Sequence, residues 1–270
     1  MKTLILILLA TTLHSNELSF GVDSGFQSYD AKTTESQSLR GEGYASVLTS
    51  HGWQNVTMNT RHISKDNAFF GVHASYDVLP SLTLGLGYRT QDLGTQNIKA
   101  TGYAVWTNGI IEDTMHGNLD NVYLSARYNF KLTDNQFLTL NGEYGLANYS
   151  STHYVTYSRR GMNTVSVTDP TQVWTTNVEM ETDENYNGAG THSAIMLGYK
   201  ANLNSHISLN LTGGIKDDEI TKVTRGAIFP TTTNPASNET PGSTVLDAAN
   251  HPSTYSFSGY VFQFSINLYI

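Results

Sequence analysis

Cysteine is absent from the 270-residue sequence, so neither a disulfide framework nor a lipid anchor attached to cysteine is available. Basic residues are few: 15 lysines and arginines against 23 acidic residues give a formal net charge of −8, which argues against a nucleic-acid partner. No long stretch repeats apolar residues every 3.6 positions, so we expect no helix after the amino-terminal segment. Metal-ligand spacing of His, Asp and Glu is also missing, as is a phosphate-binding glycine loop, so we expect no metal and no cofactor.

The last eleven residues alternate strictly between an apolar and a mostly polar face. Gln263, Ser265 and Asn267 belong to the polar face. The opposite face carries no charge and has the length that a tilted strand needs to cross hydrocarbon, so we expect it to face lipid. We interpret this segment as the terminal strand that closes a barrel against residues 18–29, with the lipid-facing side chains Tyr260, Phe262, Phe264, Ile266, Leu268 and Ile270.

Seven further segments alternate in the same way, and the connections between them differ in length. Short turns alternate with long connections, as in outer-membrane barrels with periplasmic turns and outer loops. The sequence therefore predicts an all-β fold, an eight-stranded antiparallel transmembrane up-and-down β-barrel with long extracellular loops and short periplasmic turns. The strands are expected at 18–26, 70–78, 82–88, 122–130, 138–146, 195–201, 207–215 and 255–270, and the loops at 31–66, 92–118, 150–190 and 217–254.

The amino-terminal segment favours the same location. Met1 and Lys2 precede the short apolar run Leu4–Ala10, and this order is typical of a secretory signal peptide. We divide the chain into a signal peptide, residues 1–15, and an outer-membrane β-barrel domain, residues 16–270; cleavage after Thr12 is an alternative. An even number of strands then puts both termini in the periplasm and the long loops outside the cell.

Weaker strand-like segments occur within the long loops. Tyr103–Trp106 and the following Asn108–Gly109 are typical of a hairpin with a two-residue turn. Residues 154–167 predict another hairpin, with a turn near 159–161. Neither carries an apolar face long enough to span a membrane, so we expect both above the bilayer; if they inserted, the barrel would have ten or twelve strands.

Charged residues on the inward parity of several strands predict a network in the barrel interior. Side chains just fill an eight-stranded barrel, and opposite charges there should pair because a lone buried charge is costly. The expected network comprises Asp23, His73, Arg89, Arg127 and Glu143. We interpret it as a packed polar plug; a gated pore that selects ions is the alternative.

With these strands, loops and terminal segment in place, the chain resembles the OmpA/OmpX-like small outer-membrane barrels, including the opacity-type adhesins. The resemblance covers nearly all of residues 16–270 and is architectural. It implies a monomer inserted by the barrel-assembly machinery among outer-membrane lipid and lipopolysaccharide. It also implies a surface adhesin or binding protein whose outer loops contact a host or environmental ligand, and a small porin or channel is the alternative.

An enzyme is the third class, because lipid A deacylases and surface proteases are also small barrels. A deacylase needs a Ser beside a His near the outer leaflet. His192 and Ser193 are adjacent and should point to opposite faces, whereas His206 and Ser208 share a face at a periplasmic turn. We therefore expect no enzyme, and we interpret the remaining histidines as solvated loop residues: His51, His62, His116, His153 and His251.

Charged loop residues offer two further sites of contact. The acidic run from Glu179 to Glu184 could hold a divalent cation, although a solvated loop is the preferred interpretation. Basic loop residues could contact lipopolysaccharide phosphates, with ordinary solvent contact as the alternative. These basic residues are Lys99, Arg159, Arg160, Lys216, Lys222 and Arg225.

Overall fold

The computed structural model describes most of the chain beyond the amino-terminal segment. It covers residues 17–29, 45–46, 48–50, 52–61, 66–104, 107–163, 173–230, 242–244, 252 and 254–270. The predicted signal peptide, residues 1–15, lies outside the described residues.

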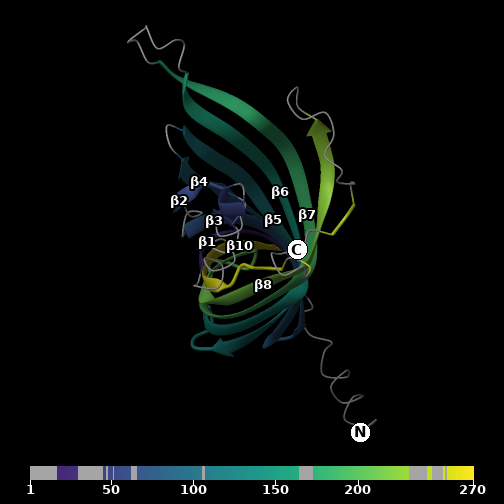
Figure 1. Ribbon diagram of the computed structural model, residues 1–270. Helices are drawn as coiled ribbons and strands as arrows, with labels where there is room; N and C mark the ends of the chain where they lie inside the picture. The colour runs from purple at the N-terminus through teal and green to yellow at the C-terminus, as the bar shows by residue number, and fades with distance from the viewer. Residues whose placement is uncertain are drawn as a thin grey trace.

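Within these ranges, eight antiparallel strands form a closed ring (Figure 1). Each strand pairs with its neighbours in the ring, and β10 pairs with both β8 and β1, so the sheet has no free edge there. The ring consists of β1 (Leu18–Tyr29), β3 (Asp66–Leu79), β4 (Leu82–Ala104), β5 (Thr107–Lys131), β6 (Gln136–Asn163), β7 (Val173–Asn202), β8 (Ile207–Pro230) and β10 (Gly259–Tyr269). The predicted eight-stranded up-and-down barrel is confirmed.

Strand β10 closes the ring over its whole length. Its residues from Gly259 to Tyr269 pair with β1, and Phe264 lies opposite Ser24. Side chains on one face of β10 are exposed, while Val261, Gln263 and the other alternate residues are buried. The predicted last strand, 255–270, is interrupted, since Tyr255–Ser256 form the separate short strand β9 on β8.

Three short turns join the strands at one end of the barrel, which we call the turn end. They connect β3 to β4, β5 to β6 and β7 to β8, as predicted. In the β5–β6 turn, Leu132 donates its backbone N–H to the Gln136 carbonyl at 2.9 Å. Lys131 lies 2.7 Å from Asp134 in the same turn, and its hydrogen bond lowers the pKa of that exposed carboxyl.

The prediction of long loops at 92–118, 150–190 and 217–254 is wrong for the described residues. Strands β4 to β8 continue through most of these ranges as a tall paired sheet (Figure 1). We call this sheet the extension: residues 91–104, 107–119, 148–163, 173–191 and 217–230. The strand pattern was missed because the alternation changes sides there, so that apolar residues face inward and polar residues outward.

Strand β5 shows this change of sides without a break in pairing. In the barrel, its outward residues include Leu124 and Val122. In the extension, outward positions are polar, as at His116, whereas Leu119 and Met115 face inward and are buried. A search for outward apolar residues therefore stops at Val122, although the strand continues to Thr107.

A β-bulge in β4 lies where the barrel meets the extension. The register between β4 and β5 shifts between Asp92 and Gly94, which leaves Leu93 as the extra residue. Gly94 has a φ of 72°, in the left-handed region that favours glycine, and its N–H donates to Asp92 Oδ1 at 2.7 Å. The bulge directs the Leu93 side chain into the interior, where it is fully buried.

We expect Gly94→Val to lower the free energy of unfolding by about 1–3 kcal/mol, because a β-branched residue is strained at positive φ. A Cβ at this position would meet no atom within 4 Å, so crowding makes no contribution. Gly94→Asn is the matched control and should lose less, since asparagine tolerates this region better. Urea unfolding in lipid bilayers measures both variants, and equal losses would contradict a backbone origin.

Two predicted hairpin turns are also wrong. Asn108 and Gly109 lie inside β5 and pair with Tyr103 and Gly102, and the ends of the hairpin are Ala104 and Thr107. Residues 154–161 continue as β6 without a turn. The two hairpins do stand beyond the apolar part of the barrel, as predicted, and add no strand to the ring.

A small apolar cluster covers the edge of the extension at β4, and includes a helical segment that was not predicted. Residues 45–46 and 48–50 are helical, and β2 (Gln54–Arg61) pairs with β4. Leu48 and Trp53 are buried against β4 and β5, and Trp53 Nε1 donates to Tyr157 Oη at 3.2 Å. A side chain at Gly102 would collide with the Trp53 side chain, so glycine is required at this close approach.

Candidate functional site

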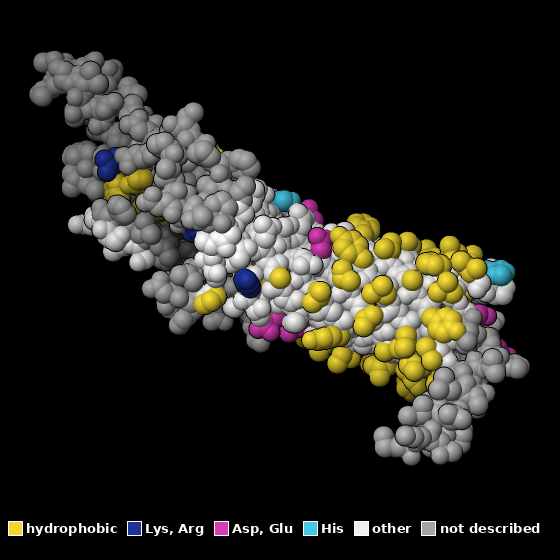
Figure 2. All heavy atoms as spheres, turned by 90° about the vertical axis from the view of Figure 1, so that its right-hand side faces the viewer, with side chains coloured by type: hydrophobic (Ala, Val, Ile, Leu, Met, Phe, Trp, Pro, Cys, Tyr) yellow, Lys and Arg dark blue, Asp and Glu magenta, His cyan; other side chains and the backbone are white. Residues whose placement is uncertain are grey.

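The outer wall of the barrel carries a continuous apolar surface, which we call the belt. It covers the half of the barrel nearest the turn end, and polar side chains replace it beyond (Figure 2). A contiguous exposed apolar surface of this extent marks contact with lipid or another apolar partner. Its members include Phe20, Val22, Phe70, Val72, Leu84, Leu86, Val122, Leu124, Leu138, Leu140, Ile195, Leu197, Leu211, Ile215, Phe262, Phe264, Ile266 and Leu268.

The interior behind the belt is polar and is crossed by a chain of ionic contacts, which we call the lumen chain: Lys216, Asp218, His192, Glu143 and Arg89. Lys216 Nζ lies 2.8 Å from Asp218 Oδ2, and His192 Nδ1 lies 2.7 Å from Asp218 Oδ1. His192 Nε2 lies 3.2 Å from Glu143 Oε2. All five side chains are buried.

Each buried carboxylate of the lumen chain pairs with a cation, Asp218 with Lys216 and Glu143 with Arg89. His192 lies between the two carboxylates, with one ring nitrogen near each of them. Pairing with a cation offsets the cost of desolvating each carboxylate.

Arg89 ends the lumen chain and makes the largest number of contacts. Its Nη1 and Nη2 donate to the two Glu143 oxygens at 3.1 and 3.3 Å, a bidentate geometry. Nη2 also donates to Gln263 Oε1 at 2.8 Å. The guanidinium lies over the rings of Phe69 and Tyr123, with 4.6 and 4.9 Å to their centroids. Together with the rest of the lumen chain, these contacts connect strands β3 to β8 and β10 across the interior, at the height of Arg89.

Asp23 and His73 form a second buried pair on β1 and β3. His73 Nδ1 lies 3.0 Å from Asp23 Oδ2, and its Nε2 lies 2.7 Å from Asn267 Oδ1. Tyr123 donates to the same Asp23 oxygen at 3.3 Å and links this pair to Arg89. The structure thus brings together four of the five predicted network residues.

Arg127, the fifth, stands apart. It forms no ion pair among the described residues, and its Nη1 lies 3.2 Å from the Asn210 side-chain oxygen once that amide is oriented to match its neighbours. Between Arg127 and Glu143 lies a polar cavity of about 30 Å³, enough for a water molecule. An interior that side chains nearly fill is usual for eight strands.

An apolar cluster closes the interior above the lumen chain. It combines inward residues of β4 to β8 with Phe257, the residue after β9. Tyr149 stacks on Phe257 with ring centroids 5.6 Å apart, and Gln27 Nε2 donates to the Phe257 carbonyl at 2.8 Å. The cluster consists of Leu93, Met115, Leu119, Ala147, Tyr149, Tyr186, Ile220, Val223 and Phe257.

Three residues of the lumen chain were missing from the predicted network. Lys216 was predicted to lie in a loop, in contact with solvent or with lipopolysaccharide phosphates, and this is wrong: its side chain is buried and donates to Gln27 Oε1 at 2.9 Å. Asp218 was likewise placed in a loop, and His192 was considered only as part of a serine dyad. Ser208, Asn210 and Thr212 face inward at every second position of β8. Counting four and six residues on from Thr212 reaches Lys216 and Asp218, so the same alternation would have indicated both.

Neither of the two predicted histidine and serine pairs has the geometry and access of a nucleophile with its base. His192 is buried and the adjacent Ser193 is exposed on the outer face. His206 is exposed at the turn end, while Ser208 is buried and contacts Tyr269 Oη at 3.2 Å. Of the other predicted loop histidines, His116 is exposed, and His51, His62 and His251 lie outside the described residues.

His153 was predicted as a solvated loop residue, and this is wrong because it is fully buried. Its Nε2 lies 2.8 Å from Ser151 Oγ, and its Nδ1 lies 3.6 Å from Asp113 Oδ1. Tyr186 packs edge-on against the imidazole. This group has the residue types of a hydrolytic triad, but Ser151 is buried inside the extension, whereas a nucleophile must meet its substrate.

Described side chains include no group of three or more His, Cys, Asp or Glu that could hold a metal ion. The side chains of Glu179, Glu181, Asp183 and Glu184, in the acidic run, lie outside the described residues, as does that of Arg160. Lys99 pairs with Glu112 at 2.5 Å on the outer face of the extension.

In the part of the chain that the structure describes, no helix is long and apolar enough to cross a membrane.

No protein-family model matches the sequence, and no curated protein matches it. Among solved structures, the attachment invasion locus protein Ail of Yersinia pestis is 8% identical with a TM-score of 0.39, over 95% of this chain and 99% of that chain. A major outer membrane protein of Thermus thermophilus is 12% identical with a TM-score of 0.39, over 95% and 100%. The outer membrane protease OmpT of Escherichia coli is 8% identical with a TM-score of 0.33, over 95% of each chain. At these scores the likeness is weak. The assignment of the barrel fold therefore rests on the strand pairing within this chain.

Proposed function

We propose that this chain is a bacterial outer-membrane β-barrel that binds a ligand at the cell surface through its extension. The extension itself carries the proposal: five ring strands continue beyond the belt as a paired sheet, and the described part of its outer face is mostly polar, with Tyr103 and Tyr154 also exposed. A sheet held by continuous backbone hydrogen bonds and its own apolar interior presents its surface in a fixed arrangement. Preorganised surfaces of this kind bind with a small loss of conformational entropy.

The belt supports the membrane placement. Only alternate residues of each strand are apolar on the outer wall, and they end at Leu146 on β6 and at Val122 on β5. A closed sheet satisfies its backbone groups internally, as a spanning structure must. We propose that the turn end and both termini lie in the periplasm, that the extension lies outside, and that the monomer is inserted by the barrel-assembly machinery. The OmpA/OmpX-like assignment stays a prediction.

A channel is less well supported by the geometry. The lumen chain and the apolar cluster above it occupy the interior at successive levels, and the polar cavity between Arg127 and Glu143 is small. We also propose that the chain is not an enzyme, since the Ser151, His153 and Asp113 group is buried.

Shortening the extension tests the proposed binding role. Gly94 pairs with Gly117, and Ser150 pairs with Asn187. Because the two residues of each pair lie side by side, a two-residue turn can replace residues 95–116 and another can replace residues 151–186. Both turns then lie at nearly the same height above the belt. We expect bacteria that display this variant to attach to an epithelial monolayer, mucin or polystyrene at least tenfold less than those displaying the wild type. The reason is that most of the proposed binding face is removed while the belt and lumen chain remain.

In the matched control, a two-residue turn replaces only residues 159–177 and joins Ser158 to Val178, which pair with each other. It keeps most of the outer face and should retain attachment. Heat-modifiable migration on a detergent gel must show that both variants fold. If the shortened barrel folds and attaches as well as the wild type on all three surfaces, the proposed function is wrong.

A further inference from the structure

We propose that the outer face of the extension binds a neutral, extended polysaccharide across β4, β5 and β6. The inference rests on the proposed binding function and deepens it, because it assigns the class of ligand and the part of the extension that holds it. We call this surface the glycan face. It consists of two rows of exposed side chains: Asn97, Thr114 and Tyr154, and, nearer the belt, Thr95, His116 and Thr152.

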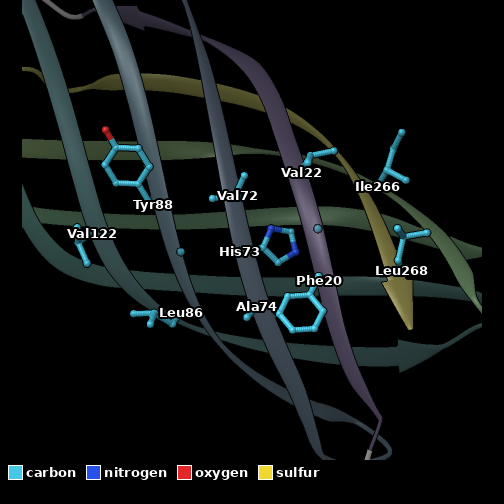
Figure 3. A pocket seen from close by; sticks show the side chains of 12 residues that line it. Phe20, Val22, Val72, His73, Ala74, Leu86, Tyr88, Val122, Ile266 and Leu268 are labelled. Atoms are coloured by element: carbon cyan, nitrogen blue, oxygen red, sulfur yellow. The ribbon is translucent and has the colours of Figure 1, made fainter. Parts of the chain in front are cut away.

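A hollow in the belt does not suit a polar ligand. It has a volume of about 620 Å³ and lies over β10, β1, β3, β4 and β5. Apolar side chains such as Phe20, Val72 and Leu86 surround it, as Figure 3 shows. A chain of sugars needs hydrogen-bond partners when it leaves water, and these side chains supply none. A surface for such a chain is therefore expected on the extension, where polar side chains face outward.

The spacing of the strands matches the repeat of a polysaccharide. Strand register places Thr114 on β5 between Asn97 on β4 and Tyr154 on β6. Adjacent strands of a sheet lie roughly 4.8 Å apart. One pyranose unit adds a similar length to an extended, β-linked chain. A chain that lies along the row therefore places successive sugar units on successive strands, each beside a hydroxyl or amide group.

Hydrogen bonds within the rows hold the polar groups in place. Thr114 Oγ1 donates to Asn97 Oδ1 at 2.9 Å, which leaves the amide N–H groups of Asn97 to donate to a ligand. In the other row, Thr95 Oγ1 lies 3.4 Å from His116 Nδ1. Side chains that are already oriented lose less conformational entropy when a ligand binds. The glycan face is thus partly preorganised for a ligand that both donates and accepts hydrogen bonds.

Tyr154 adds an aromatic surface at one end of its row. The residue is 43% exposed and lies beside the hydroxyl of Thr114. A sugar carries C–H groups on the faces of its ring and hydroxyl groups around the edge. The aromatic ring can pack on a sugar face, while the neighbouring threonine bonds to a hydroxyl at the edge. This combination of groups fits a saccharide.

Charge at the margins of the glycan face disfavours an anionic chain. Lys99 lies one row beyond Asn97 and is paired with Glu112 at 2.5 Å. Asp92 lies at the opposite margin, and its Oδ1 is 3.7 Å from His116 Nε2. An anionic polysaccharide would meet a carboxylate at each margin, and the lysine is already engaged. The face therefore favours a neutral chain.

Substitutions in one row test the assignment. Tyr154→Ala and Thr114→Val remove the aromatic surface and a hydroxyl. Tyr103→Ala and Thr221→Val are the matched controls, because they make the same changes at exposed positions outside the two rows. Calorimetric titration of the barrel in lipid nanodiscs with the neutral hexasaccharides of cellulose and chitin gives the dissociation constants. We expect at least one of the two to bind the wild type and both controls. It should bind at least tenfold more weakly to Tyr154→Ala and at least threefold more weakly to Thr114→Val.

Other outcomes would overturn the inference. Heat-modifiable migration first establishes that each variant folds. If neither neutral hexasaccharide binds the folded wild type, or if only the charged hexasaccharides of heparin or chitosan bind, the ligand class is wrong. Equal losses in the variants and in their controls would contradict the assignment to these rows. The proposed function fails by a different result, because it requires that shortening the extension reduces the attachment of bacteria whatever the ligand is.

Discussion

Glu143→Gln is expected to lower the free energy of unfolding by about 3–5 kcal/mol, the usual cost of breaking a buried ion pair by removing one partner. The substitution keeps the shape of the side chain and removes its charge. Arg89 and His192, both fully buried, would then face a neutral amide where each now faces a carboxylate. Urea unfolding of the barrel in lipid bilayers gives the free energy.

The ion pair of Arg89 with Glu143 predicts an order among the variants. Arg89→Met should cost less than Glu143→Gln, because Asn141 Nδ2 still donates to Glu143 Oε1 after the arginine is removed. The double variant Arg89→Met with Glu143→Gln should recover part of the loss, since it leaves no uncompensated guanidinium. If Arg89→Met proved more damaging than Glu143→Gln, this account of the contacts of Glu143 would be wrong.

Phe264→Arg is expected to destabilise the barrel by about 2–4 kcal/mol, the cost of a basic side chain on the lipid face near the middle of the bilayer. Phe264 is exposed at the centre of the outward face of β10, between Phe262 and Ile266. The same unfolding measurement applies, with the protein in lipid.

Tyr260→Arg is the matched control because it lies on the same face of β10, at its upper end. A charge there can reach the interface, so the expected loss is about 0–1 kcal/mol. Depth dependence is the feature that separates a lipid-facing wall from an ordinary exposed surface. Equal losses at the two positions would mean that the belt does not face hydrocarbon.

The barrel itself could be predicted from the sequence because period-two alternation is a local property. Strands such as β3 and β10 carry outward apolar residues, and their faces follow from parity alone. The pairing of β10 with β1 also followed, since a spanning sheet cannot leave an edge in lipid.

The extension could not be found by the same pattern, because its alternation has the opposite sense. There the apolar residues point inward, as Leu119 and Met115 do on β5, whereas in the belt they point outward. The bulge at Gly94 also changes parity within β4. The lumen chain was partly missed for this reason: Lys216 and Asp218 lie where the outer face of β8 has already become polar, so their strand was taken to have ended.

One consequence of the unbroken pairing of β5 concerns insertions and deletions. Residues 107–131 form one strand with an exposed apolar side chain at Val122 and a buried one at Leu119. Losing a single residue between these positions would turn every side chain on one side of the deletion to the opposite face, whereas losing two would only shorten the molecule by one step. Changes in the height of the extension above the belt are therefore expected to occur in steps of two residues, together in the strands that share its pairing.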